Sequence, residues 1–79
     1  MAQLAKEIEK ILIPEVGEFV AKATIKRQCS LIGITPETLS FKEFDVFLEK
    51  LENSINFLAG KEVAKRVVEK ARELKFLTH

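Results

Sequence analysis

The chain has 79 residues, 47% of them hydrophobic, and its 13 basic and 12 acidic side chains give a net charge of +1. This length predicts one domain, over residues 1–79, and the near-zero charge excludes a general attraction to nucleic acid or to acidic membranes. One cysteine, Cys29, excludes an internal disulfide, and no uncharged run approaches the roughly 20 residues of a membrane span. Charged residues interrupt the N-terminal apolar residues, which argues against a signal peptide, and a lone free thiol favours the cytoplasm.

Residues 2–13 have the spacing of an amphipathic helix. Its apolar stripe consists of Leu4, Ile8, Ile11 and Leu12. Pro14 follows, and proline either kinks a helix or opens the next one. Since the chain is more apolar than so small a domain needs, we expect this first helix to swing away at Pro14. We therefore predict that its stripe is an oligomer interface.

Residues 14–32 predict a second helix with two neighbouring apolar stripes. One stripe consists of Val16, Phe19, Val20, Ala23 and Leu31, and the other of Ile25, Cys29 and Ile32. A face this wide is typical of a helix that is covered on two sides. Gly33 is the expected terminator, because glycine adopts a positive φ without steric cost.

Residues 35–59 predict a short turn and then a third helix. Thr35-Pro36-Glu37 has the residue order of a single helical turn, and Ser40 with Glu43 has the spacing of a capping box. The stripe that follows is regular, and we expect it to be core: Phe44, Phe47, Leu48, Leu51, Ile55 and Leu58. Gly60 is expected to end this helix.

Residues 61–77 predict the last helix, with Ala64, Val67, Val68, Ala71 and Leu74 inside. The segment 61–79 carries six basic and three acidic residues, so it is the only mildly cationic part of the chain. Its candidate basic face consists of Lys61, Lys65, Arg66, Lys70, Arg72 and Lys75. No alternating strand pattern or hairpin turn occurs, and the fold class expected is all-α, a compact bundle of three to four helices.

Candidates for chemistry are few. His79 is the terminal residue, and Cys29 has the spacing of a buried side chain, although Lys26 and Arg27 beside it leave a reactive thiol as the alternative. No phosphate-binding, metal-ligating or cofactor motif occurs, so we expect no catalytic, cofactor or metal site. Among the six phenylalanines, Phe41, Phe57 and Phe76 lie partly off their stripes, and one or two of them are expected to face a partner.

Two stretches resemble known motifs. Residues 28–40 resemble the core of a bacterial helix-turn-helix, with Cys29 four residues before the turn glycine, and Leu39 and Ser40 at the start of the recognition helix. The same residues also fit a glycine C-cap, a proline turn and a capping box. Residues 31–77 resemble small helical modules of prokaryotic regulatory and signalling proteins, a resemblance that implies no activity.

The sequence thus predicts a non-catalytic helical protein-interaction module whose partner is itself, as a homo-oligomer, or another protein. The alternative is a small helix-turn-helix-like DNA-binding regulator that uses the basic face of residues 61–75. Membrane binding is not expected. No small-molecule substrate is expected either, because no polar group is placed to orient one.

Overall fold

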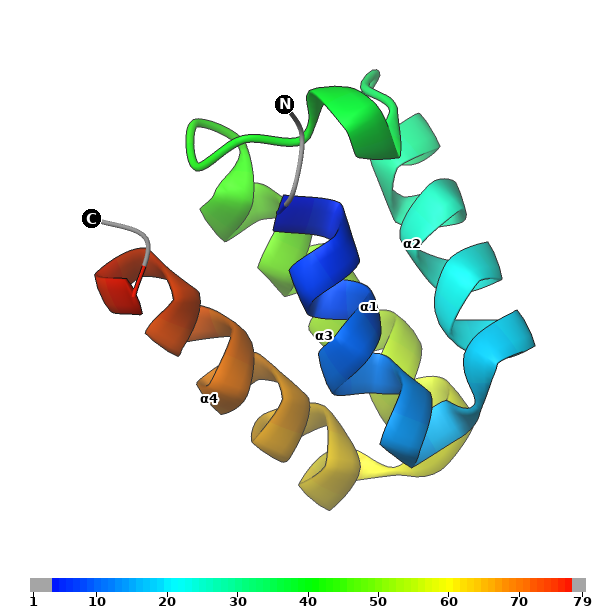
Figure 1. The fold of residues 1–79 in the computed structure, drawn as a ribbon. Helices are drawn as coiled ribbons and strands as arrows, with labels where there is room; N and C mark the ends of the chain where they lie inside the picture. Colours follow the sequence, from blue (N-terminus) through cyan, green and yellow to red (C-terminus); the bar gives the residue numbers. More distant parts are fainter. Residues whose placement is uncertain (1–3, 78–79) are drawn as a thin grey trace.

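Four α-helices make up most of the chain in the computed structural model, which describes residues 4–77, with side chains up to Leu74. They are α1 (Leu4–Val16), α2 (Glu18–Leu31), α3 (Phe44–Ala59) and α4 (Lys61–Leu77), and one 3₁₀ turn, η1 (Pro36–Thr38), lies between α2 and α3 (Figure 1). No strand occurs between residues 4 and 77. The prediction of an all-α bundle of three to four helices is confirmed.

The bundle consists of two tight helical hairpins and a longer connection between them. A single residue, Gly17, separates α1 from α2, and another, Gly60, separates α3 from α4. Both hairpins therefore bring their two helices together at once. Residues 32–43 join α2 to α3, and this connection runs across one end of the bundle (Figure 1).

The first reversal occurs at Gly17, and the prediction of a break at Pro14 is wrong. Pro14 lies inside α1, which continues to Val16. Gly17 has φ 91° and ψ 160°, a backbone conformation that is essentially restricted to glycine. Its amide donates to the Ile13 carbonyl at 2.9 Å and its carbonyl accepts from the Ala21 amide at 2.9 Å. Proline near a helix end costs one hydrogen bond, whereas reversing the chain needs the positive φ.

The end of α2 confirms the terminator predicted at Gly33. Gly33 has φ 80°, its amide donates to the Ser30 carbonyl at 3.1 Å, and the Ile34 amide donates to the Cys29 carbonyl at 2.9 Å. This pair of bonds is a Schellman motif, which satisfies carbonyls that the helix end leaves free. The predicted short turn follows as η1, where the Thr35 hydroxyl accepts from the Thr38 amide.

The capping box at Ser40 and Glu43 is formed only in part. The Glu43 carboxylate accepts from the Ser40 amide at 3.1 Å and from the Ser40 hydroxyl at 2.9 Å. The Ser40 hydroxyl in turn accepts from the Lys42 amide at 3.3 Å. These hydrogen bonds hold the pKa of Glu43 below its usual value. A turn thus occupies residues 41–43, and α3 begins at Phe44, later than the box predicted.

One apolar cluster fills the space between the helices. The predicted inner residues of α4 are all buried, and α3 buries its stripe from Phe44 through Ile55. The connection contributes Leu39, which is 3% exposed. The fully buried side chains of the cluster include Ile8, Leu12, Cys29, Phe44, Phe47, Leu51, Ile55 and Ala71.

The first helix is part of this core, which corrects its prediction as an oligomer interface. Ile8 and Leu12 are fully buried and Leu4 is 9% exposed, while Ile11 packs half-buried against the same cluster. The hairpin at Gly17 folds α1 back on its own chain, so the stripe keeps little free surface for a neighbour. The surplus of apolar residues in the sequence therefore lies on other parts of the chain than α1.

Replacement of Phe47 by alanine is expected to destabilise the fold by about 3–5 kcal/mol, because the side chain is fully buried. The matched control is Phe57→Ala on the same helix, where the side chain is 91% exposed. That change is expected to stay within about 0.5 kcal/mol. Urea melts of the two variants measure both values, and equal losses would contradict this placement of α3.

Gly17→Ala is expected to cost about 1–3 kcal/mol, because alanine must adopt the conformation at φ 91° with no compensating contact. Pro14→Ala is expected to stabilise the protein, because proline disfavours a helix interior by up to about 3 kcal/mol. Thermal melts of both variants separate the two positions. If Pro14→Ala lowered the melting temperature and Gly17→Ala did not, the chain reversal would depend on Pro14 instead of on Gly17.

Candidate functional site

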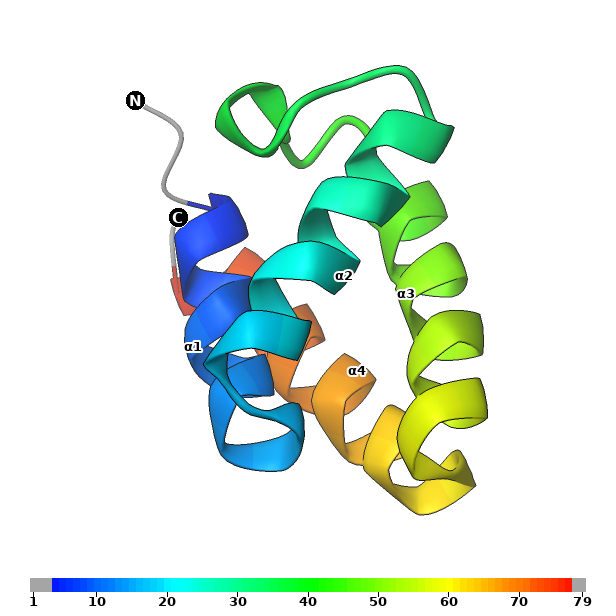
Figure 2. The ribbon, with the colours of Figure 1, turned by 90° about the vertical axis from the view of Figure 1, so that its right-hand side faces the viewer.

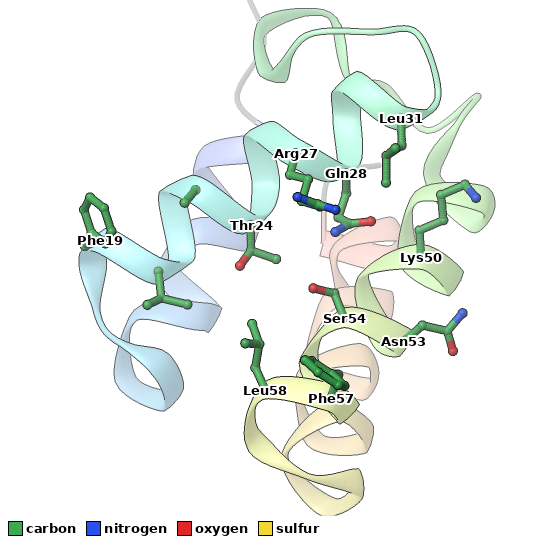
Figure 3. Close-up of a pocket in the computed structure, with 12 residues that line it drawn as sticks. Phe19, Thr24, Arg27, Gln28, Leu31, Lys50, Asn53, Ser54, Phe57 and Leu58 are labelled. Carbon is green, nitrogen blue, oxygen red and sulfur yellow. The ribbon is translucent and has the colours of Figure 1, made fainter.

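An open groove with a volume of about 690 Å³ lies between α2 and α3 (Figure 3). The two helices supply its walls from stripes at helical spacing. From α2 come Phe19, Val20, Ala23, Thr24, Arg27, Gln28 and Leu31, and from α3 come Lys50, Asn53, Ser54, Phe57 and Leu58. We call this feature the α2–α3 groove.

The groove follows from the hairpin architecture. The Gly17 reversal packs α2 chiefly on α1, and the Gly60 reversal packs α3 chiefly on α4, so fewer contacts join α2 to α3. Figure 2 shows α2 and α3 close together beside the connection and splayed apart toward the other end. Between the two hairpins, α2 and α3 therefore leave an uncovered face.

The rim of the groove is apolar. Phe19 is 85% exposed, Phe57 91%, Leu31 60% and Leu58 54%, and all four line it. The predictions that put Phe19, Leu31 and Leu58 on inner stripes are wrong. The stripe of α2 that enters the core runs instead through Ala21, Ile25 and Cys29.

Of the off-stripe phenylalanines, Phe57 is the one that lies open on the groove. Phe41 is 38% exposed and makes an edge-to-face contact with Phe44, with ring centroids 5.1 Å apart. The Phe76 side chain lies outside the part that the structure describes. An exposed partner-facing phenylalanine therefore remains a prediction, with Phe57 as its candidate.

Polar side chains also line the groove, and the helical spacing does not predict them. Thr24 is 6% and Gln28 4% exposed, and Figure 3 shows Thr24 and Ser54 facing each other across the groove, with Arg27 and Gln28 extending into it. Every polar residue in the lining carries a hydrogen-bond donor, and Arg27 and Lys50 are cations. The lining contains no Asp or Glu. The lining therefore carries positive charge without an acidic side chain to offset it, and its hydroxyl and amide groups can donate or accept hydrogen bonds.

The basic face predicted on α4 is less cationic than the sequence suggests. Arg66 binds Glu15 of α1 through two hydrogen bonds, of 2.8 and 2.9 Å. The hydrogen bond from Arg66 lowers the pKa of Glu15, so this ion pair ties α1 to α4 instead of leaving Arg66 free for phosphate. Glu62 and Glu69 lie among the lysines on the same surface. Lys75 has its side chain outside the described part.

The segment that resembles a helix-turn-helix has no recognition helix at the expected place. After the turn at Gly33 the chain forms only the three residues of η1, and Leu39 is extended and buried. The next α-helix begins at Phe44. The prediction that Leu39 and Ser40 begin a recognition helix is wrong, because the proline turn and the Ser40–Glu43 bonds hold residues 35–43 in a connection.

Cys29 is fully buried in the core. Burial raises the pKa of its thiol to about 11, and the negative charge of Glu37 acts in the same direction. A thiol that is both inaccessible and protonated is a poor nucleophile. The structure therefore places Cys29 with the packing residues.

Among the residues that the structure describes, no group of three or more His, Cys, Asp or Glu side chains could hold a metal ion. Within the same part of the chain, no helix is long and apolar enough to cross a membrane. A scan against protein-family models found no match, and searches of curated proteins and of solved structures found none either. The α2–α3 groove is thus the candidate site on its geometry alone.

Alkylation of Cys29 by iodoacetamide at pH 7 is expected to be at least about a hundred-fold slower than that of a cysteine in an unstructured peptide. A free thiol, with a pKa of about 8.5, is roughly 3% ionised at pH 7, far more than a thiol with a pKa of about 11. Mass spectrometry over time measures the rate, and unfolding in guanidinium serves as the control that restores ordinary reactivity. Rapid labelling of the native protein would contradict the burial of Cys29.

Proposed function

We propose that this chain is a non-catalytic protein-interaction module whose interface is the α2–α3 groove. The observation that carries the proposal is the position of Phe19 and Phe57, which are 85% and 91% exposed on opposite walls of one groove. Isolated exposed apolar residues are ordinary, but large apolar side chains gathered around a concavity are typical of an interaction surface.

Binding suits this lining better than catalysis does. General acid–base or nucleophilic chemistry is carried most often by His, Asp, Glu, Cys or an activated Ser beside a base. The groove lining holds no His, Asp, Glu or Cys, and its one amine on α3, Lys50, makes no hydrogen bond to Ser54 and extends away from it (Figure 3). Donors and apolar surface, by contrast, are what recognition of another chain requires.

The predicted self-association now depends on this groove instead of on α1. The stripe of α1 is used in the core of its own chain, so it no longer supports a homo-oligomer. The DNA-binding alternative has less support as well, because Arg66 is paired with Glu15 and acidic residues interrupt the lysines of α4. Phosphate contact depends on clustered free cations.

A photo-reactive phenylalanine analogue at position 57 is expected to cross-link the protein to a defined partner in the cells that produce it. The same type of cross-linker at Glu69, exposed on α4, is the control outside the groove. The purified partner should bind the native chain and should bind the variant Phe19→Ser/Phe57→Ser at least ten-fold more weakly, on the order of 1.4 kcal/mol. Isothermal calorimetry measures both affinities.

Both serine substitutions lie on exposed side chains, so circular dichroism should show the same helix content as in the native chain. If position 57 gave no more cross-link than position 69, the proposed function would be overturned. A cross-link to a second copy of this chain would identify the partner as itself.

A further inference from the structure

We propose that the occupant of the α2–α3 groove is an amphipathic helix of another protein that brings a carboxylate side chain onto Arg27. This inference rests on the proposed function and names the chemistry of its partner. It depends on three properties of the groove: the secondary structure of its walls, the composition of its lining, and the charge that two copies would present to each other.

The helical walls favour a helix over an extended peptide. An added strand needs free backbone amides and carbonyls along a sheet edge. Here both walls are α-helices, whose backbone groups are used within each helix. A helix satisfies its own backbone hydrogen bonds, so it can enter the groove by offering side chains alone. Apolar side chains at i, i+3 or i+4, and i+7 of the incoming helix would meet the rim.

The openness of the groove favours a macromolecule over a small ligand. Sites for small molecules enclose most of the ligand surface. This groove is a trough along the outside of two helices, with rim residues such as Phe57 almost wholly exposed (Figure 3). The α2 wall has 14 residues and thus a length of about 21 Å, enough to follow four turns of a partner helix.

The donors of the lining select a carboxylate. Arg27 offers a planar fork of N–H groups, and Gln28 beside it offers an amide (Figure 3). Thr24 and Ser54 can donate hydroxyl protons, and Lys50 adds a second positive charge on the α3 side. Because none of the lining residues is an acid, an acidic side chain of the partner would meet these donors without a competing negative charge.

The same charges disfavour a second copy of this chain. In a two-fold symmetric dimer each surface faces its own image. A symmetric contact between two α2–α3 grooves would gather four cations, Arg27 and Lys50 of each copy, in one interface, with no carboxylate in either lining. Like charges at an interface weaken it, so the lining favours a different partner over a second copy. A different protein with an acidic helix has no such conflict.

The probes are three synthetic helices of about 18 residues with one leucine stripe at i, i+3, i+4 and i+7, flanked by Glu, by Gln or by Lys. The full-length native protein is titrated with each helix, and affinity is measured by calorimetry and location by amide chemical shifts. The Glu helix is expected to shift residues of the α2–α3 groove. It should bind at least ten-fold more tightly than the Lys helix, with the Gln helix between them.

The variant R27E/K50E is expected to reverse this order, so that the Lys helix becomes the tightest. The control K61E/K65E makes the same change in net charge at exposed positions on α4 and should leave the order unchanged. Should reversal of charge disturb the fold, as judged by circular dichroism, R27Q/K50Q should remove the preference for Glu without reversing it.

Equal binding of the three helices in the groove would overturn the carboxylate while leaving the groove as an interface. No binding of any helix at groove residues would overturn the helical occupant. A full-length protein that sediments as a dimer, and whose dimer is broken by the groove substitutions, would make the second copy the occupant instead. The proposed function fails separately, through the absence of a cross-link from position 57.

Discussion

When a single glycine connects two helices and reverses the chain, the helices must lie side by side. This constraint determines much of the bundle. Gly17 pairs α1 with α2, and Gly60 pairs α3 with α4. The Glu15–Arg66 ion pair then joins the hairpins along α1 and α4. Since the remaining connection spans residues 32–43, α2 and α3 can splay at the far end, and the α2–α3 groove follows from that freedom.

Features set by neighbouring residues could be predicted from the sequence. The stripe of α3 repeats every three or four residues with little ambiguity, and Phe44 through Ile55 are buried as expected. Gly33 and the Thr35-Pro36 turn lie where their local chemistry places them, because both depend on hydrogen bonds within a few residues. The break at Pro14 was wrong, since proline in the last turn of a helix is compatible with the helix and Gly17 alone permits the reversal.

In the sequence, only an excess of apolar residues on α2 indicates the candidate site. The sequence shows that α2 has two apolar stripes, which indicates that two surfaces cover it, but nothing local tells which surface belongs to the same chain. The stripe with Ile25 and Cys29 enters the core, and the stripe with Phe19 and Leu31 borders the groove. The sequence does not identify Thr24 and Gln28 as groove residues, because they line the groove only once α3 brings Ser54 opposite α2.

The energies involved explain why the polar floor matters as much as the apolar rim. Burying one large apolar side chain contributes about 1.5–3 kcal/mol, and the four rim residues are only half to nine-tenths exposed before binding. Their combined contribution is therefore of the same order as the roughly 4–15 kcal/mol that association costs in lost freedom. An apolar helix alone would bind weakly. A charge-assisted hydrogen bond adds about 1.5–3 kcal/mol, enough for Arg27 and its neighbours to decide which helix stays. In a groove of this composition, the apolar rim supplies affinity for helices in general, and the hydrogen-bond donors of the lining determine which helix binds most tightly.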